Sequence, residues 1–280
     1  MKQTYDLIVP IGYACSCTQS LRKAGLQLVS FPWDWISVAS PTERCRFICD
    51  GFKGFIDLED LEPTGMRTEL GNEKVVNRRN GIVFLHDFAF GVPIVEQYQA
   101  VATKYARRAA RLDRLVKSAR RVLLVTVDVP ITPEPTSVAE CENAMSIMAR
   151  HYPGVKFEYL LVNLLKGRTL ENRIDEIPAP GFRRIGFDYK SYDPDAPAYG
   201  IEIGMVAAFL KGEYEVREYR TDAEIAAHKA KRRDARNRKL MRKMEELGAS
   251  NRFEYALFRA GRALRGLVAF CMGLVSGRRH

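Results

Sequence analysis

The sequence lacks long apolar runs and the patterns that usually hold metals or nucleotides. Its uncharged stretch 266–277 has 12 residues, whereas about 20 are needed to span a bilayer. It contains no glycine-rich phosphate loop and no dinucleotide fingerprint, so we expect no nucleotide cofactor. Its six cysteines lack paired Cys-x-x-Cys spacing, which predicts no structural zinc site. We therefore expect neither a cofactor nor a metal.

The start of the chain shows no secretory leader, because residues 1–4 lead directly into an apolar segment. An even number of cysteines in such a chain does not indicate a disulfide framework. We therefore expect a cytoplasmic protein with reduced thiols. With 46% hydrophobic residues over 280 positions, the chain can build a substantial core.

The positive charge is concentrated at the end of the chain. Residues 222–280 carry 15 Lys/Arg and 6 Asp/Glu, a net charge of +9, whereas residues 1–221 carry 29 and 28, a net charge of +1. We predict an α/β catalytic body over 1–221 and a basic helical tail over 222–280. A nearly neutral body gives no reason to expect nucleic-acid binding.

Apolar runs typical of strands alternate with segments that carry helix-start signals. Ser40-Pro41 and Ser137 begin capping-box patterns, and Pro93 begins a long amphipathic segment. Asn80-Gly81 is a turn signal that favours a hairpin. The alternation predicts an α/β fold with a mostly parallel sheet and helices on both faces, a Rossmann-like three-layer arrangement. The expected strands are 5–11, 82–86, 121–128, 156–165 and 182–187.

The carboxyl ends of the expected strands carry the polar candidates for a site. Cys15 follows the first strand and Gly12, and a helix is expected from Thr18 to Ala24. This position predicts a thiolate stabilised by backbone N–H groups and the helix dipole. His86 is the histidine best placed to act as its base. The side chains expected to meet at this edge of the sheet are Cys15, His86, Asp128 and Asn163.

Four sequence blocks resemble a bacterial family described as papain-like cysteine peptidases. They are Ile11-Gly12-Tyr13-Ala14-Cys15, Leu21-Arg22-Lys23-Ala24-Gly25-Leu26, Phe31-Pro32-Trp33-Asp34-Trp35-Ile36 and Phe84-Leu85-His86-Asp87-Phe88. The resemblance covers roughly residues 5–130. It implies that Cys15 is a nucleophile and His86 its base, and it implies a context of surface-polysaccharide genes.

Several roles stay open at this stage. Asp34, Asp87, Asp128 and Asn163 are all candidates to orient His86, and Asp34 is slightly favoured. The predicted function is that of a thiol-dependent hydrolase or acyl transferase that acts on a glycan or peptide-like substrate. The alternative is a glycosyltransferase-type or glycan-binding protein without covalent catalysis, in which Trp33 and Trp35 flank Asp34 at a sugar site.

Within the tail, residues 252–275 have an amphipathic helical pattern. Four arginines fall on one side at 100° per residue, and leucine, valine and phenylalanine fall on the other. Such a helix lies in a membrane interface. We therefore expect it to bind an anionic membrane and to hold the protein peripherally at the inner membrane face.

Overall fold

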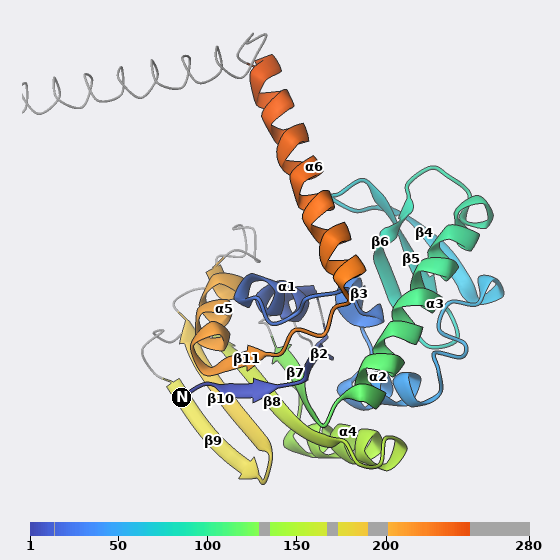
Figure 1. The fold of residues 1–280 in the computed structure, drawn as a ribbon. Helices are drawn as coiled ribbons and strands as arrows, with labels where there is room; N and C mark the ends of the chain where they lie inside the picture. Colours follow the sequence, from blue (N-terminus) through green and yellow to red (C-terminus); the bar gives the residue numbers. More distant parts are fainter. Residues whose placement is uncertain (14, 129–134, 167–172, 190–200, 247–280) are drawn as a thin grey trace, which may run out of the picture. The chain divides into compact units, whose positions relative to one another are not determined.

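The computed structural model describes residues 1–13, 15–128, 135–166, 173–189 and 201–246. These residues belong to two units, 1–219 and 220–280. The described residues of the first unit form a mixed α/β fold with three sheets (Figure 1). The predicted α/β class and the mostly parallel main sheet are therefore confirmed.

The main sheet has five strands in the order β2-β7-β8-β10-β9. All its neighbouring pairs are parallel except β10 and β9, which are antiparallel. Val9 pairs with Leu124, and Asp128 with Asn163. Its strands are β2 (Leu7–Pro10), β7 (Arg121–Asp128), β8 (Lys156–Lys166), β9 (Arg173–Ala179) and β10 (Phe182–Tyr189).

Alternate residues along the strands of the main sheet pack into two different hydrophobic clusters. Leu124 packs in a cluster with residues of the helices α2 to α4, whereas Leu123 packs in a cluster with residues of α1 and α5. The continuous apolar runs of the sequence follow from this burial on both faces. The helices of the first unit are α1 (Cys15–Ala24), α2 (Pro41–Cys49), α3 (Ile94–Ser118), α4 (Val138–His151) and α5 (Ile201–Glu213).

The signals that mark helix ends are confirmed at three places. Ser40 makes the predicted capping box with Glu43, and Pro41 occupies the first turn of α2. The Ser137 hydroxyl accepts a hydrogen bond from the Glu140 amide at the start of α4. Gly25 ends α1 with a φ of +77°, a conformation that glycine adopts without steric cost.

His86 does not lie in the main sheet, contrary to the prediction. It belongs to β6, which continues to Ala89 in an antiparallel sheet of order β3-β6-β5-β4. The Asn77 carboxamide accepts hydrogen bonds from the amides of Arg79 and Asn80 and closes a short turn. A turn this short brings β6 back beside β5, so the pair must be antiparallel. The strands are β3 (Ile36–Ser37), β4 (Leu61–Arg67), β5 (Asn72–Asn77) and β6 (Val83–Ala89).

The remaining elements are short or belong to the second unit. β1 pairs in parallel with β11, and the described part of the second unit contains α6. None of the described helices is long and apolar enough to cross a membrane. Residues 252–275 lie outside the described residues. The bounds of these elements are β1 (Gln3–Tyr5), η1 (Pro32–Trp35), η2 (Leu58–Asp60), β11 (Tyr214–Val216) and α6 (Asp222–Glu246).

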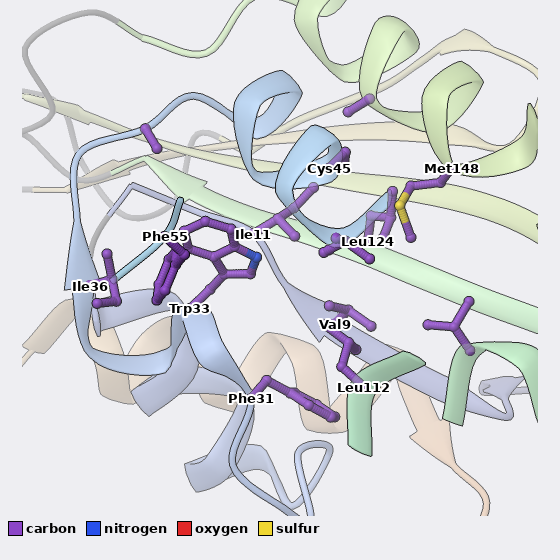
Figure 2. Packing of buried hydrophobic residues seen from close by; sticks show 14 of the residues in the cluster. Val9, Ile11, Phe31, Trp33, Ile36, Cys45, Phe55, Leu112, Leu124 and Met148 are labelled. Carbon is purple, nitrogen blue, oxygen red and sulfur yellow. The ribbon is translucent and has the colours of Figure 1, made fainter. Parts of the chain in front are cut away.

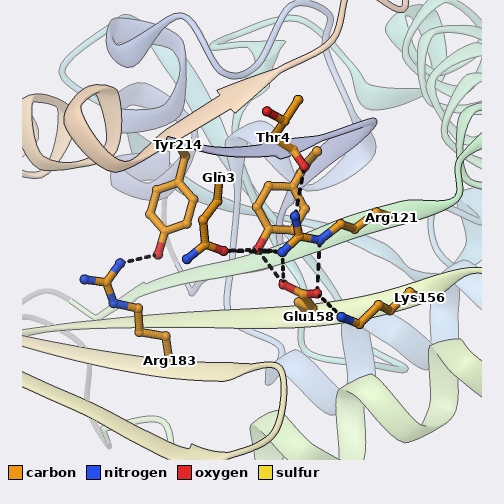
Figure 3. Close-up of polar contacts among 8 residues, drawn as sticks. Gln3, Thr4, Arg121, Lys156, Glu158, Arg183 and Tyr214 are labelled. Atoms are coloured by element: carbon orange, nitrogen blue, oxygen red, sulfur yellow. Dashed lines mark hydrogen bonds and ion pairs between the residues drawn. The ribbon is translucent and has the colours of Figure 1, made fainter. Parts of the chain in front are cut away.

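A polar network joins the beginning of the chain to the main sheet (Figure 3). The Glu158 carboxylate on β8 accepts hydrogen bonds from Arg121 on β7 at 2.7 and 3.0 Å and from the Tyr5 hydroxyl at 2.6 Å. Lys156 also pairs with it at 2.7 Å. Burial by itself would raise the pKa of Glu158, but these donors lower it to about 2. The network therefore stabilises the ionised carboxylate.

We predict that Glu158→Gln removes a pH-dependent part of the stability. Because the folded pKa is about 2 and the ordinary value 4.5, the carboxylate stabilises the fold above pH 4.5, and that contribution is lost as the pH falls towards 2. At pH 7 the variant should lose about 2 kcal/mol of unfolding free energy. Urea unfolding at several pH values measures this. Equal losses at pH 7 and pH 2.5 would contradict the prediction.

Candidate functional site

Cys15 is the first residue of α1, directly after the turn that follows β2. The helix starts three residues earlier than expected. Cys15 is half-buried, and its Sγ accepts a hydrogen bond from the Gln19 side-chain amide at 3.5 Å. Gln19 was not singled out in the sequence, although its i+4 spacing places it on the same helical face. Ala14 lies outside the described residues.

The charge state of Cys15 differs from the expected one. Burial raises the pKa of the Cys15 thiol, and the hydrogen bond from Gln19 acts in the opposite direction. A helix start was expected to favour the thiolate, but the loss of solvation outweighs that effect. At neutral pH the resting group is therefore a thiol.

Gly12 and Cys17 fix the position of α1 against the sheet. Cys17 is fully buried, and its thiol donates to the Val125 carbonyl at 3.2 Å, so its role is structural. A Cβ atom at Gly12 would lie 3.1 Å from the Cys17 Cβ and 3.1 Å from the Val127 nitrogen. Glycine is thus required at position 12, because Cys17 and the backbone of Val127 approach it too closely for a side chain. It lies buried and serves to place the helix that carries Cys15.

Arg44 also stabilises the turn before Cys15, through main-chain carbonyl oxygens. Its guanidinium is completely buried and donates to the carbonyl oxygens of Tyr13 at 3.0 Å and Val38 at 2.8 Å. It also donates to the Ala39 and Ile36 carbonyls at 3.1 and 3.2 Å. Burial lowers the pKa of Arg44 to about 10, which still leaves it charged at pH 7.

Val38 and Ala39 have φ values of +68° and +72°. Such values are unfavourable for residues with a Cβ, above all for β-branched valine. Because Arg44 binds the carbonyls of both residues, it stabilises this conformation. The buried cation therefore connects the Cys15 turn to the segment after η1.

Among the described residues, no hydrogen bond joins Asp34 to His86. Its carboxylate is completely buried and accepts hydrogen bonds from Arg22 at 2.5 Å and from Gln27 at 2.7 Å, with Thr18 at 3.4 Å. Burial raises the pKa of Asp34, while the positive charge of Arg22 acts against the rise. The favoured role of Asp34 as the group that orients His86 is not what this geometry provides. Instead Asp34 ties α1 to η1.

Asp87 is also engaged elsewhere. Its carboxylate pairs with Lys104 and accepts a hydrogen bond from the Tyr105 hydroxyl at 2.8 Å, both on α3. As neighbours on β6, Asp87 and His86 extend towards opposite faces of the strand. Asp87 therefore anchors β6 to α3 and does not bind the imidazole.

His86 packs edge-on against the Trp35 indole, with 5.4 Å between ring centroids. The Arg22 guanidinium lies 5.4 Å from the centroid of the same indole. Burial lowers the pKa of His86, and Asp87 acts against this, so the ring is neutral at pH 7. Among the described residues, no hydrogen bond joins His86 to Cys15.

Cys15 begins α1, and Arg22 in the last turn of the same helix contacts Trp35. Cys15, Gln19 and Arg22 are spaced i, i+4 and i+7 on α1 and therefore share a face. The Arg22 guanidinium lies near the Trp35 indole, and His86 packs against the same indole. Arg22 and Trp35 therefore connect α1 to His86 on β6.

The two tryptophans have different environments. Trp33 is 1% exposed and packs against Phe47, Phe52 and Phe55 with centroid distances of 5.1–5.8 Å. Figure 2 shows it beside Phe55 inside the core. Trp33 is therefore not available as a sugar-stacking wall. Trp35 is half-buried and remains available.

Asp128 and Asn163 form a buried pair at the carboxyl ends of β7 and β8. The Asn163 amide donates to Asp128 at 3.1 Å, and Thr136 donates to both carboxylate oxygens at 2.6 and 2.9 Å. Burial raises the pKa of Asp128. The bonds of this pair hold the segment before α4 in place. The described residues contain no group of three or more His, Cys, Asp or Glu suited to a metal ion.

The fold and this region define an α/β protein with an accessible cysteine at the start of its first helix. A family model described as "putative papain-like cysteine peptidase" matches residues 6–167. The chain belongs to this family, which confirms the family expected from the sequence blocks. It is also 27% identical over 196 residues to an uncharacterized protein of Acanthamoeba polyphaga mimivirus, covering 65% of this chain and 81% of that protein. No solved structure matches the chain.

We predict that Arg44→Lys destabilises the protein although it keeps the charge. An ammonium group cannot span the carbonyls of Tyr13, Val38 and Ala39 together, so buried acceptors lose their donors. The free energy of unfolding should fall by about 2–4 kcal/mol, as measured by urea unfolding. Arg46→Lys, on the exposed side of the same helix, should change it by less than about 0.5 kcal/mol. Similar losses in both variants would refute the assignment.

Proposed function

We propose that the protein is a thiol-dependent hydrolase or acyl transferase with Cys15 as its nucleophile. The observation that carries the proposal is the position of Cys15: half-buried on the first turn of α1, with the Gln19 amide 3.5 Å from its sulfur. The other described cysteines have thiols whose pKa values burial raises to about 11 or above. A Rossmann-like three-layer arrangement is the scaffold that we propose for this site.

In the proposed reaction the thiol loses its proton as it attacks. Cys15 rests as a neutral thiol and His86 as a neutral imidazole, which is the form that can accept a proton. The Cys15 sulfur adds to an acyl carbon, the proton passes to His86, and His86 then protonates the leaving group. Water or a second acceptor releases the acyl group from Cys15. The Gln19 amide and the N–H groups of the first helical turn would stabilise the developing oxyanion.

His86 has to approach Cys15 for this transfer, because the resting structure holds it against Trp35. Catalytic hydrogen bonds are often long in ligand-free enzymes and tighten when substrate binds. Substrate seated between Trp35 and α1 would bring the two groups together. We propose a glycan or a peptide-like amide as the substrate. We also propose that the reaction belongs to surface-polysaccharide synthesis.

A second candidate is a glycan-binding or glycosyltransferase-type function without covalent chemistry. It is favoured by Trp35, whose indole is half-buried and contacts both Arg22 and His86. An indole with polar neighbours is suited to stacking on a sugar ring. This form of the alternative no longer includes Trp33 or Asp34, since both are buried.

We predict that iodoacetamide labels Cys15 before any other described cysteine. Because burial raises its pKa, the labelling rate should increase with pH between 7 and 9, and Gln19→Ala should slow it. Peptide mass spectrometry measures the order. Cys49→Ala is the matched control for a half-buried thiol and should leave labelling of Cys15 unchanged. Faster labelling of Cys49 than of Cys15 would contradict the prediction.

Hydrolysis of an activated acyl ester tests the reaction itself. Cys15→Ser should abolish it, and His86→Ala should reduce it by about 100-fold or more, while Cys49→Ala should leave it intact. Hydrolysis should fall with decreasing pH as His86 becomes protonated, below its ordinary pKa of 6.5. If Cys15→Ser retains full hydrolysis, the thiol mechanism is wrong and the binding function takes its place.

We also propose that residues 252–275 bind an anionic membrane surface at the inner membrane face. The support is the charge of +9 over residues 222–280. Each Lys/Arg near an anionic surface contributes about 1 kcal/mol of attraction.

Deletion of residues 250–280 should abolish sedimentation with phosphatidylserine vesicles at low salt. It should leave the melting temperature nearly unchanged, because the main core lies within residues 1–219. Replacing Arg252, Arg259, Arg262 and Arg265 by Gln is the charge control and should weaken sedimentation strongly. A full-length protein that ignores these vesicles would overturn the assignment.

A further inference from the structure

A groove outside the Cys15 region lies between α3 and the segment that follows α2. Its volume is about 640 Å³, within the usual range for ligand pockets of roughly 300–1,000 Å³. One side is formed by small residues together with Tyr105 on one face of α3, and the other by larger apolar residues from 48–56. The four small residues are Ala102, Ala106, Ala109 and Ala110.

The groove is elongated and has a polar end. Its lining on α3 extends from Ala102 to Lys117, which corresponds to about 22 Å at 1.5 Å per residue. Along most of this length the wall is apolar, with Phe52 and Phe55 opposite the alanines. Asp113, Lys117 and His151 line it near the carboxyl end of α3. This shape suits a narrow apolar chain with one polar end.

The polar end has hydrogen-bond donors that Asp113 leaves unused. The Asp113 carboxylate accepts from Lys117 at 2.7 Å and from the Tyr152 hydroxyl at 3.0 Å, so both of its oxygens have donors. Lys117 is 63% exposed and keeps further N–H donors, and His151 is exposed. A carboxylate could therefore accept hydrogen bonds there without displacing Asp113.

Phe52 supports a ligand role for the apolar wall. It has a φ of +61°, which is unfavourable for a residue with a large side chain. Its amide donates to the Phe47 carbonyl at 2.8 Å, and its ring packs against Trp33 and Phe55 at 5.5 and 5.3 Å. Residues held in such conformations are concentrated at ligand-binding sites. Here the strained backbone places a half-exposed ring along the groove.

We propose that this groove binds a linear amphiphile: an acyl chain along the alanine face of α3, with a carboxylate at Lys117 and His151. The assignment is independent of the proposed thiol chemistry, because Cys15, Gln19 and His86 do not line the groove. A helix of a second copy of the chain is the competing occupant, and the experiment distinguishes the two.

Calorimetric titration of the full chain with dodecanoate, below its critical micelle concentration, tests the site. Ala106→Trp and Ala110→Trp fill the groove from exposed positions, so each should fold with an unchanged melting temperature and bind at least about tenfold more weakly, a difference of 1.4 kcal/mol. Ala100→Trp lies on the same helix, is exposed and does not line the groove; it should bind as the unsubstituted chain does.

The head group is tested with dodecyltrimethylammonium, which has the same chain and the opposite charge. It should bind more weakly than dodecanoate, and Lys117→Gln should lower dodecanoate affinity by about threefold without lowering that of the cation. No binding of dodecanoate, or equal binding by Ala106→Trp and Ala100→Trp, would overturn the proposal. Self-association that Ala106→Trp abolishes, without dodecanoate binding, would assign the groove to a second copy.

Discussion

A buried cation that has no carboxylate partner among the described residues holds together the parts of the structure on which the candidate site depends. Arg44 binds four main-chain carbonyls, from Tyr13 before the first helix and from Ile36, Val38 and Ala39 after η1. Its guanidinium also lies 4.9 Å from the Trp33 ring centroid. An unpaired charge is costly to bury, and these acceptors offset part of that cost. Its position in the fold is therefore strongly constrained.

The carboxylates expected to take part in chemistry mostly join elements of the structure. Asp34 connects α1 to η1, Asp87 connects β6 to α3, and Asp128 holds the segment before α4. Each is bound by several donors and largely shielded from solvent. The candidate groups without such a structural role are the Cys15 thiol, the Gln19 amide, the Trp35 indole and the His86 imidazole. That set is compatible with acyl chemistry that uses uncharged resting groups.

Local signals in the sequence predicted the elements well, because they depend on neighbouring residues. Ser40, Pro41 and Ser137 marked helix starts, and the apolar run 121–128 matches β7. The sheet to which each strand belongs could not be read in this way, since β6 and β7 have similar compositions. The Asn80-Gly81 turn held the necessary information: a short hairpin excludes β6 from a parallel pairing with β5.

The candidate site was predictable only in part, because much of it depends on contacts between residues distant in sequence. The sequence identified Cys15 and His86, and it indicated the importance of the 31–35 segment. It could not show that Trp33 faces the core and Trp35 does not, because that depends on how η1 packs on α2 and α3. Arg44 gave no signal at all, since its partners are main-chain carbonyls distant in sequence. Loss of solvation at Cys15 likewise depends on packing from several elements.

The pairing of β2 with β7 has a consequence for how the chain folds during synthesis. Leu7 pairs with Val122, so the strand that leads to Cys15 is made early but finds its partner only after more than a hundred further residues. The β5–β6 hairpin needs no such wait, because its strands are joined by a short turn. The nascent chain can therefore form its antiparallel sheet while the thiol segment is still without its neighbour. Cys15 takes its place only once both ends of that long interval have been translated.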